Sequence, residues 1–136
     1  MVRVDALDHV NIVARDLGET VGFYADLLDL EPRDPPPPLD PARVQWMHDG
    51  EGRAIFHLST PGSLLDEAPI EDIPRHSGAV HHVALACSGH DAMVARLAGR
   101  GLDHRLNHVE AIDLKQIFVR DPNGVLLELN YFAGHH

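Results

Sequence analysis

The chain has 136 residues and a formal net charge of −10, from 11 lysines and arginines against 21 aspartates and glutamates. This length predicts one domain with a substantial core, and the acidic balance argues against a nucleic-acid surface, which needs a basic patch. Because the sequence has no 18-residue apolar run, no leader-like start and a single cysteine, Cys87, we expect a cytoplasmic protein without a membrane span.

The first half of the chain predicts a strand, a helix and two further strands. Segment 7–17 has the alternating, β-branched character of a strand, and segment 16–30 has helical spacing with an N-cap at Asp16. The proline-rich segment 32–41 predicts a rigid loop, because proline fits neither a helix interior nor a central strand. Segment 44–62 predicts two strands joined by the turn signal DGEG.

The same order returns after a linker at 61–79. Segment 80–88 predicts a strand, and segment 89–101 predicts a helix that stops at a glycine. Three more strands are predicted, with a tight DPNG turn between the last two, at 102–110, 114–121 and 125–132. The chain therefore reads as strand–helix–strand–strand–strand twice, in modules of about 5–60 and 80–132, with the second strand of the first module obscured by prolines.

Coordinating residue types occupy matched positions in the two modules. His9 precedes His57 by 48 residues, and His82 precedes Glu128 by 46 residues. Alternation along each strand places these four side chains opposite the more apolar face, which a helix should cover. The four residues would then line the concave face of a curved mixed sheet, which predicts a cup with coordinating groups inside it.

Two imidazoles and a carboxylate from separate strands form a set that binds a divalent metal and leaves positions open for an oxygen substrate. We expect His9, His82 and Glu128 to be the ligands of one ion of iron, manganese, nickel or zinc. His57 remains open between a fourth ligand, an acid/base group and a cavity wall. Three polar residues predicted on the same faces are candidate substrate contacts: Asn11, Ser59 and Asn130.

Ordinary structural roles compete with this interpretation. A single buried histidine is more often a hydrogen-bonded core residue, and a single strand glutamate more often faces water. The matched spacing of the set favours the metal site over these separate explanations. Two histidines at the end of the sequence, His135 and His136, are left out because they resemble the stub of a purification tag.

Three segments resemble the vicinal oxygen chelate superfamily of glyoxalases, bleomycin-resistance proteins and extradiol dioxygenases. They are LDHVNIVARDLGETVGFYADLLDL, VHHVALAC and KQIFVRDPNGVLLELN, and with the repeat spacing the resemblance covers most of residues 5–132. It implies an α+β fold of two βαβββ modules forming a cup around a divalent metal held by His9, His82 and Glu128. Homodimers are also implied, in some members with each site built from two chains.

The resemblance implies a metal-dependent enzyme that acts on a small molecule with neighbouring oxygens, as a lyase, an isomerase or a ring-cleaving dioxygenase. Glyoxalase-like members tend to carry a glutamate where this sequence has His57, which argues against the glutathione-hemithioacetal reaction. The alternative is a non-catalytic protein that sequesters a drug or metabolite, as bleomycin-resistance proteins do. Such binders do not need the His/His/Glu set, so its presence favours the enzyme.

Overall fold

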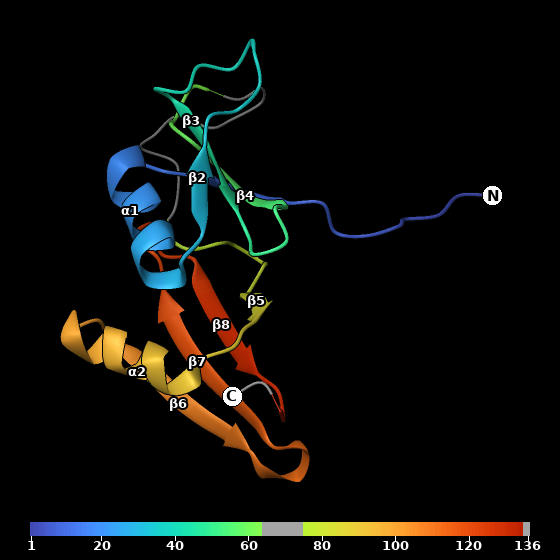
Figure 1. The fold of residues 1–136 in the computed structure, drawn as a ribbon. Helices are drawn as coiled ribbons and strands as arrows, with labels where there is room; N and C mark the ends of the chain where they lie inside the picture. The colour runs from blue at the N-terminus through green and yellow to red at the C-terminus, as the bar shows by residue number, and fades with distance from the viewer. Residues whose placement is uncertain (64–74, 135–136) are drawn as a thin grey trace. The chain divides into compact units, whose positions relative to one another are not determined.

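The structure, a computed structural model, describes residues 1–63 and 75–134. Most of the predicted linker lies outside the described residues, as do His135 and His136. The chain forms two compact units, Met1–Ile70 and Glu71–His136. Each unit joins one α-helix to a mixed four-stranded sheet in the order strand–helix–strand–strand–strand (Figure 1). The α+β class and the two βαβββ modules are therefore confirmed.

In the first unit, the first and last strands lie side by side. Its sheet has the strand order β1-β4-β3-β2, with β1 parallel to β4 and the other pairs antiparallel. The predicted N-cap is confirmed, because the side chain of Asp16 accepts a hydrogen bond of 3.0 Å from the backbone N–H of Glu19. The elements are β1 (Val10–Val13), α1 (Leu17–Leu28), β2 (Glu31–Arg33), β3 (Val44–His48) and β4 (Ala54–Ser59).

The start of the proline-rich segment forms part of a strand, although the sequence predicts a loop there. Pro32 and Arg33 belong to β2, so the loop predicted over 32–41 begins two residues too early. β2 is an edge strand that pairs only with β3, with Pro32 opposite Met47. Proline is tolerated at an edge because one side of such a strand makes no ladder hydrogen bonds.

Helix α1 covers the apolar face of the first sheet. Tyr24 of α1 is fully buried, and its ring lies 4.8 Å from that of Phe56 on β4. Met47 and Leu58, on the same face as Phe56, are also fully buried. Ile55 and His57, which alternate with them, are only partly buried and lie on the opposite face. This alternation is the one that the sequence predicts for β4.

The second unit repeats the arrangement. Its sheet has the order β5-β8-β7-β6, with β5 parallel to β8 and the other pairs antiparallel. Neither helix of the described residues has the length and apolar character of a membrane-crossing segment. The elements are β5 (Val83–Ala86), α2 (His90–Gly99), β6 (His104–Val109), a short 3-10 turn (Glu110–Ile112), β7 (Leu114–Arg120) and β8 (Leu126–Tyr131).

Strand β8 shows the strictest alternation in the second unit. Leu127, Leu129 and Tyr131 are fully buried, whereas the residues between them, including Glu128, are partly buried. The ring of His90, at the start of α2, meets Tyr131 edge to face at 5.2 Å. The helix start thus lies on the apolar face of β8, and Glu128 faces the other way.

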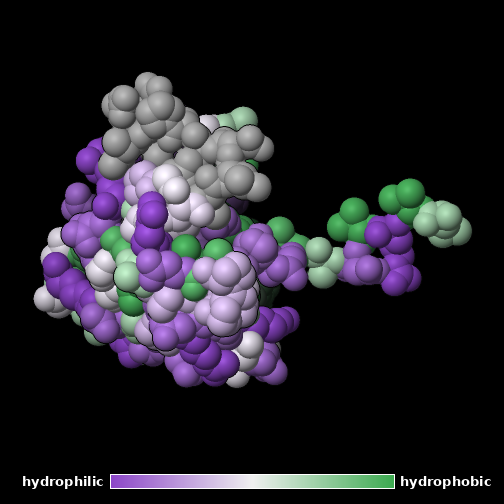
Figure 2. Space-filling model, turned by 90° about the horizontal axis from the view of Figure 1, so that it is seen from above, coloured by the Kyte–Doolittle hydropathy of each residue, from purple (hydrophilic) through white to green (hydrophobic). Residues whose placement is uncertain are grey.

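The N-terminal residues 1–9 form neither helix nor strand, so the strand predicted from residue 7 begins only at Val10. Figure 2 shows this segment extending from the body with apolar and polar groups both exposed. Its large apolar side chains are exposed: Met1, Val2, Val4 and Leu7. His9 therefore lies just before β1 rather than inside it.

The predicted DPNG turn leads directly into β8. The N–H of Gly124 donates to the Asp121 carbonyl at 3.1 Å, which closes the turn. The Asp121 carboxylate accepts from the N–H groups of Asn123, at 2.8 Å, and Val125, at 2.9 Å. Gly124 has φ +89°, and a Cβ at this position would overlap the backbone carbonyl of Arg75. Only glycine satisfies both demands.

We therefore expect Gly124→Ala to destabilise the protein by about 1–3 kcal/mol from backbone strain, with a further loss from the displaced Arg75 segment. Gly50→Ala is the matched control, because nothing lies within 4 Å of its Cβ position and its φ is not positive. Urea unfolding followed by far-UV circular dichroism measures both. Equal midpoints for the two variants would contradict the turn's role.

Candidate functional site

The sheet register confirms that the candidate residues occupy equivalent positions in the two units. Asn11 lies opposite His57 in the parallel β1–β4 pair, and Ala84 lies opposite Glu128 in the parallel β5–β8 pair. His9 is two residues before Asn11, and His82 is two residues before Ala84. Each unit thus holds one histidine just before its first strand and one coordinating residue on its last strand.

In the first unit, three aromatic rings form a stack across neighbouring strands. The rings of His9 and His57 have centroids 3.6 Å apart and planes inclined by 12°. On its other face, the ring of His57 lies 4.0 Å from that of Trp46, with planes inclined by 9°. We call His9, His57 and Trp46 the aromatic stack. Trp46 thus belongs to the candidate site, whereas its neighbour Met47 belongs to the core.

The environment of His57 keeps it uncharged. Burial and, after it, the neighbouring ring of His9 lower the pKa of His57 below its ordinary value. At neutral pH the His57 ring is therefore neutral and has one N–H and one bare nitrogen.

His9 has a carboxylate partner in the preceding residue. Its Nδ1 lies 2.5 Å from Oδ2 of Asp8, and the hydrogen bond and charge of His9 lower the pKa of Asp8. With Nδ1 engaged in this way, Nε2 is the atom of His9 that can accept a metal ion. A carboxylate on the distal nitrogen is a common feature of metal-binding histidines because it fixes the tautomer.

Asn11 and Ser59, both predicted as substrate contacts, bind each other in the structure. The hydroxyl of Ser59 donates to Oδ1 of Asn11 at 2.9 Å. Ser59 is fully buried, whereas Asn11 is exposed. The bond therefore fixes the Asn11 amide and leaves its Nδ2 group to face outward.

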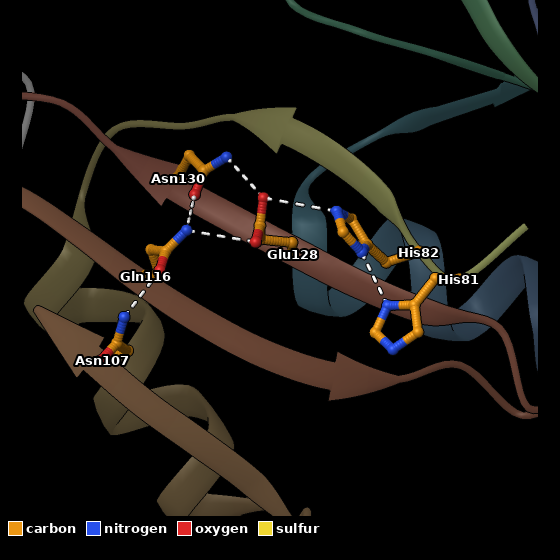
Figure 3. Close-up of polar contacts among 6 residues, drawn as sticks. All are labelled: His81, His82, Asn107, Gln116, Glu128 and Asn130. Carbon is orange, nitrogen blue, oxygen red and sulfur yellow. Dashed lines mark hydrogen bonds and ion pairs between the residues drawn. The ribbon is translucent and has the colours of Figure 1, made fainter. Parts of the chain in front are cut away.

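The second unit brings His82 and Glu128 together. Nε2 of His82 lies 3.8 Å from Oε2 of Glu128, with side-chain exposures of 38% and 14% (Figure 3). The Nδ1 atom of His82 lies 2.9 Å from Nδ1 of His81, so one of these two nitrogens donates to the other. As at His9, the residue just before the histidine engages Nδ1 and leaves Nε2 for other contacts.

Both carboxylate oxygens of Glu128 receive an amide hydrogen bond. Nε2 of Gln116 on β7 donates to Oε1 at 3.1 Å, and Nδ2 of Asn130 donates to Oε2 at 3.0 Å. Gln116 also donates to Oδ1 of Asn130 at 3.1 Å and accepts from Asn107 of β6 at 2.8 Å. We call Asn107, Gln116 and Asn130 the amide network. Figure 3 shows it running across the sheet to Glu128.

The amide network explains how a carboxylate is tolerated in an apolar strand. Hydrogen bonds to a charged group contribute about 1.5–3 kcal/mol, more than those between neutral groups. Two such donors hold Glu128 in one orientation, with Oε2 toward His82. The arrangement presents a fixed carboxylate and a fixed imidazole nitrogen on the same face of one sheet.

The first unit therefore holds one of the three predicted ligands, His9 beside His57, and the second holds two, His82 and Glu128. Within either unit, the described residues contain no cluster of three or more histidine, cysteine, aspartate or glutamate side chains suited to hold a metal.

Sequence reasoning missed Gln116 and Asp8 as parts of the site. Alternation places Gln116 on the face opposite the buried Ile117, but only the register reveals that it lies beside Asn130. Asp8 precedes the predicted ligand in the sequence, so the DH pair was a signal that could have found it. The contact between Trp46 and His57 depends in the same way on the register of β3 against β4.

Cys87 is not a candidate nucleophile. Burial raises the pKa of its thiol to about 11, against an ordinary value of 9.0, so the thiol is protonated at neutral pH.

The fold recurs in solved structures of other proteins. The chain is 20% identical to lactoylglutathione lyase from Agrobacterium tumefaciens, with a TM-score of 0.63 and 93% of each chain covered. A genomically encoded fosfomycin resistance protein from Listeria monocytogenes has 13% identity and a TM-score of 0.68, covering 94% of this chain and 93% of its own. At these identities the similarity shows a shared fold of paired βαβββ units.

Sequence comparison identifies the family of the chain. It belongs to the Glyoxalase/Bleomycin resistance protein/Dioxygenase superfamily, whose family model matches residues 6–129. The Arabidopsis thaliana protein Glyoxylase I 4 is 25% identical over 133 residues, which cover 94% of this chain and 71% of the plant protein. The resemblance seen in the sequence motifs is thus confirmed.

We expect Gln116→Leu to lower the free energy of unfolding by about 1–3 kcal/mol, because it leaves a partly buried carboxylate with one donor fewer. Asn107→Ala, at the exposed outer end of the amide network, should cost about 0.5 kcal/mol or less. Urea denaturation at pH 7 measures both changes. A Gln116 variant as stable as the Asn107 variant would show that Glu128 does not depend on this donor.

We also expect Cys87 to resist thiol reagents in the folded protein. A pKa of about 11 in place of 9.0 lowers the thiolate fraction at pH 8 about one hundredfold, since each unit is a factor of ten. Reaction with a disulfide reagent should therefore be at least that much slower in buffer than in urea. Comparable rates in the two conditions would mean that the thiol is accessible and ionised.

Proposed function

We propose that this chain is a divalent-metal-dependent enzyme that acts on a small molecule with neighbouring oxygen atoms. His9, His82 and Glu128 would hold the metal. The observation that carries the proposal is the pairing of His82 with a Glu128 carboxylate whose two oxygens are each fixed by an amide donor, at the positions that match His9 and His57 in the other unit.

The donor set fits a first-row divalent ion. Two imidazoles and one carboxylate suit iron, manganese, nickel or zinc and leave positions open on an octahedral ion. In both histidines the preceding residue engages Nδ1, so Nε2 is presented. The outer contacts of all three ligands are thus in place, as is usual around protein metal sites.

The charge balance around Glu128 also supports a cation. Among the described residues, the ion pair made by Glu128 is with His82, and its 3.8 Å separation is longer than a hydrogen bond. A carboxylate that is 14% exposed gains little from so distant an imidazole. A dication bound by His82 and Glu128 would compensate the charge of this carboxylate directly.

We propose that His9, His82 and Glu128 bind one ion per chain. We also propose that the chain forms a homodimer, with each site built from one chain or from two. We propose a cytoplasmic location, where Cys87 stays reduced.

When bound, the metal would supply a Lewis acid with open positions for two substrate oxygens. The chain's own groups would orient the substrate around it. Asn11, held by Ser59, presents an amide N–H₂ that can donate to a substrate oxygen, and Asn130 fixes the Glu128 carboxylate. This chemistry serves a lyase, an isomerase or an extradiol-type dioxygenase, which share the need for a chelating substrate.

The first test is metal content. Protein purified without a nickel column and reconstituted anaerobically should bind about one divalent ion per chain. His82→Ala and Glu128→Gln should each weaken binding about one hundredfold or more, because each removes a ligand. His108→Ala is the matched control, since that exposed histidine pairs with Asp113 and should leave metal content unchanged. Failure of the wild-type protein to bind any ion would contradict the metal site.

The second test is a substrate screen with the iron, manganese, nickel and zinc forms. Catechols, methylglyoxal–thiol adducts, and fosfomycin with thiols represent the reaction types of the superfamily. Oxygen consumption on a catechol with iron alone would select the dioxygenase, and turnover of an adduct under nitrogen would select the lyase or isomerase. Tight binding of one of these molecules by metal-free protein without turnover would instead identify a sequestering protein of the bleomycin-resistance type.

A further inference from the structure

The role of His57 can be inferred from the geometry of the aromatic stack. His57 stands where Glu128 stands in the other unit, so the repeat alone suggests a ligand at this position. Its surroundings differ from those of Glu128, because both faces of its ring are covered by other rings, His9 on one side and Trp46 on the other.

A metal ion binds imidazole in the plane of the ring, along the lone pair of the bare nitrogen, at about 2.0–2.1 Å for zinc. The rings of His9 and His57 are 3.6 Å apart and only 12° from parallel. An ion midway between the two planes would lie as much as 1.8 Å out of each, half the centroid separation. That offset is close to the whole length of the metal–nitrogen bond, so neither lone pair would point at the ion.

An ion that lies in the ring plane of His9 is therefore out of the ring plane of His57, and an ion in the plane of His57 is out of that of His9. The two residues cannot both bind the same ion through their lone pairs. Of the two, His9 has the engaged Nδ1 that is typical of a ligand, through Asp8 at 2.5 Å. The ring of His57 is instead covered on both faces, by His9 and by Trp46. Its ring makes its main contacts through its faces rather than through its edge.

We infer that His57 is a positioning residue and not a fourth ligand: its ring, backed by Trp46, holds the ring of His9 in place by stacking. The inference rests on the proposed metal site. It leaves three protein ligands and so keeps more than one coordination position open for a chelating substrate. It also explains how a histidine can replace the glutamate of glyoxalase-like relatives without adding a nitrogen ligand.

The support from Trp46 is built into the sheet. Trp46 and His57 are direct partners in the antiparallel β3–β4 pair, so their side chains project from the same face. His9 reaches the stack from just before β1, which pairs with β4 on its other side. Among these three residues, His9 lies outside the paired strands, and stacking against His57 orients its ring.

Two substitutions separate stacking from coordination. His57→Phe keeps a flat ring and removes both nitrogens, whereas His57→Ala removes the ring as well. We expect the phenylalanine variant to bind Co²⁺ with an affinity within about threefold of the wild type, and the alanine variant to bind about tenfold more weakly, as for loss of an orienting neighbour. The cobalt absorption spectrum should keep its shape in the phenylalanine variant, because the ligand set is unchanged.

A fourth-ligand role predicts no difference in affinity between the two variants. Both variants would then lose affinity about equally, by about one hundredfold, and the phenylalanine variant would show an altered cobalt spectrum. Far-UV circular dichroism confirms that each variant is folded. Wild-type protein that binds no Co²⁺ would refute the metal site itself, so that result is distinct from failure of the inference about His57.

A measurement on the wild-type protein makes the inference independent of folding defects. In protein with ¹⁵N-labelled histidine, addition of one equivalent of Zn²⁺ should shift two imidazole nitrogens, those of His9 and His82, to metal-bound frequencies. Metal-bound shifts for three histidines would overturn the assignment of His57 as a positioning residue.

Discussion

The candidate site depends on one constraint, the parallel pairing of the first and last strands in each unit. A parallel pair requires a long connection between its strands, and here a helix and two antiparallel strands provide it. Residues almost fifty positions apart in the sequence therefore become neighbours. The pairing brings His9 against His57 and His82 against Glu128, and because it occurs twice it sets two half-sites with the same layout.

The two half-sites use the same positions for different purposes. On β8 the position holds a carboxylate, and neighbouring positions on β6, β7 and β8 carry amides that hydrogen-bond to it or to each other. On β4 the equivalent position holds His57, and the neighbouring strand carries an aromatic ring. One half is built from hydrogen bonds to a charge, and the other from contacts between ring faces. The two units thus share one backbone arrangement but differ in the side-chain interactions at the equivalent position.

Much of the fold follows from local patterns in the sequence. The helices, the DGEG and DPNG turns and the alternation in β8 depend on nearby residues, so periodicity and turn chemistry predict them. The residues of β2 were not identified because Pro32 is typical of a loop. A strand is possible there because β2 lies at the edge of its sheet. The predicted starts of β1 and β5, at residues 7 and 80, are too early, because these strands begin at Val10 and Val83. A β-branched pattern does not reveal where strand pairing begins.

The site was predictable in its residue types but not in its contacts. Similar spacing in the two modules, 48 and 46 residues, was enough to select His9, His57, His82 and Glu128 as candidates, because strand register preserves such spacing. The roles of Gln116, Trp46 and Asp8 depend on which side chains lie across from one another or on which rotamer a ring adopts. These are properties of pairing and packing, which no single segment of sequence contains.

The aromatic stack also gives the protein an intrinsic optical signal. Trp46 is the only tryptophan in the chain, so its fluorescence comes from a single environment. That indole lies against His57, which in turn lies against His9. Events at His9 are thus two ring contacts away from the sole strong fluorophore, and occupancy of the site becomes visible in the emission of the unlabelled protein.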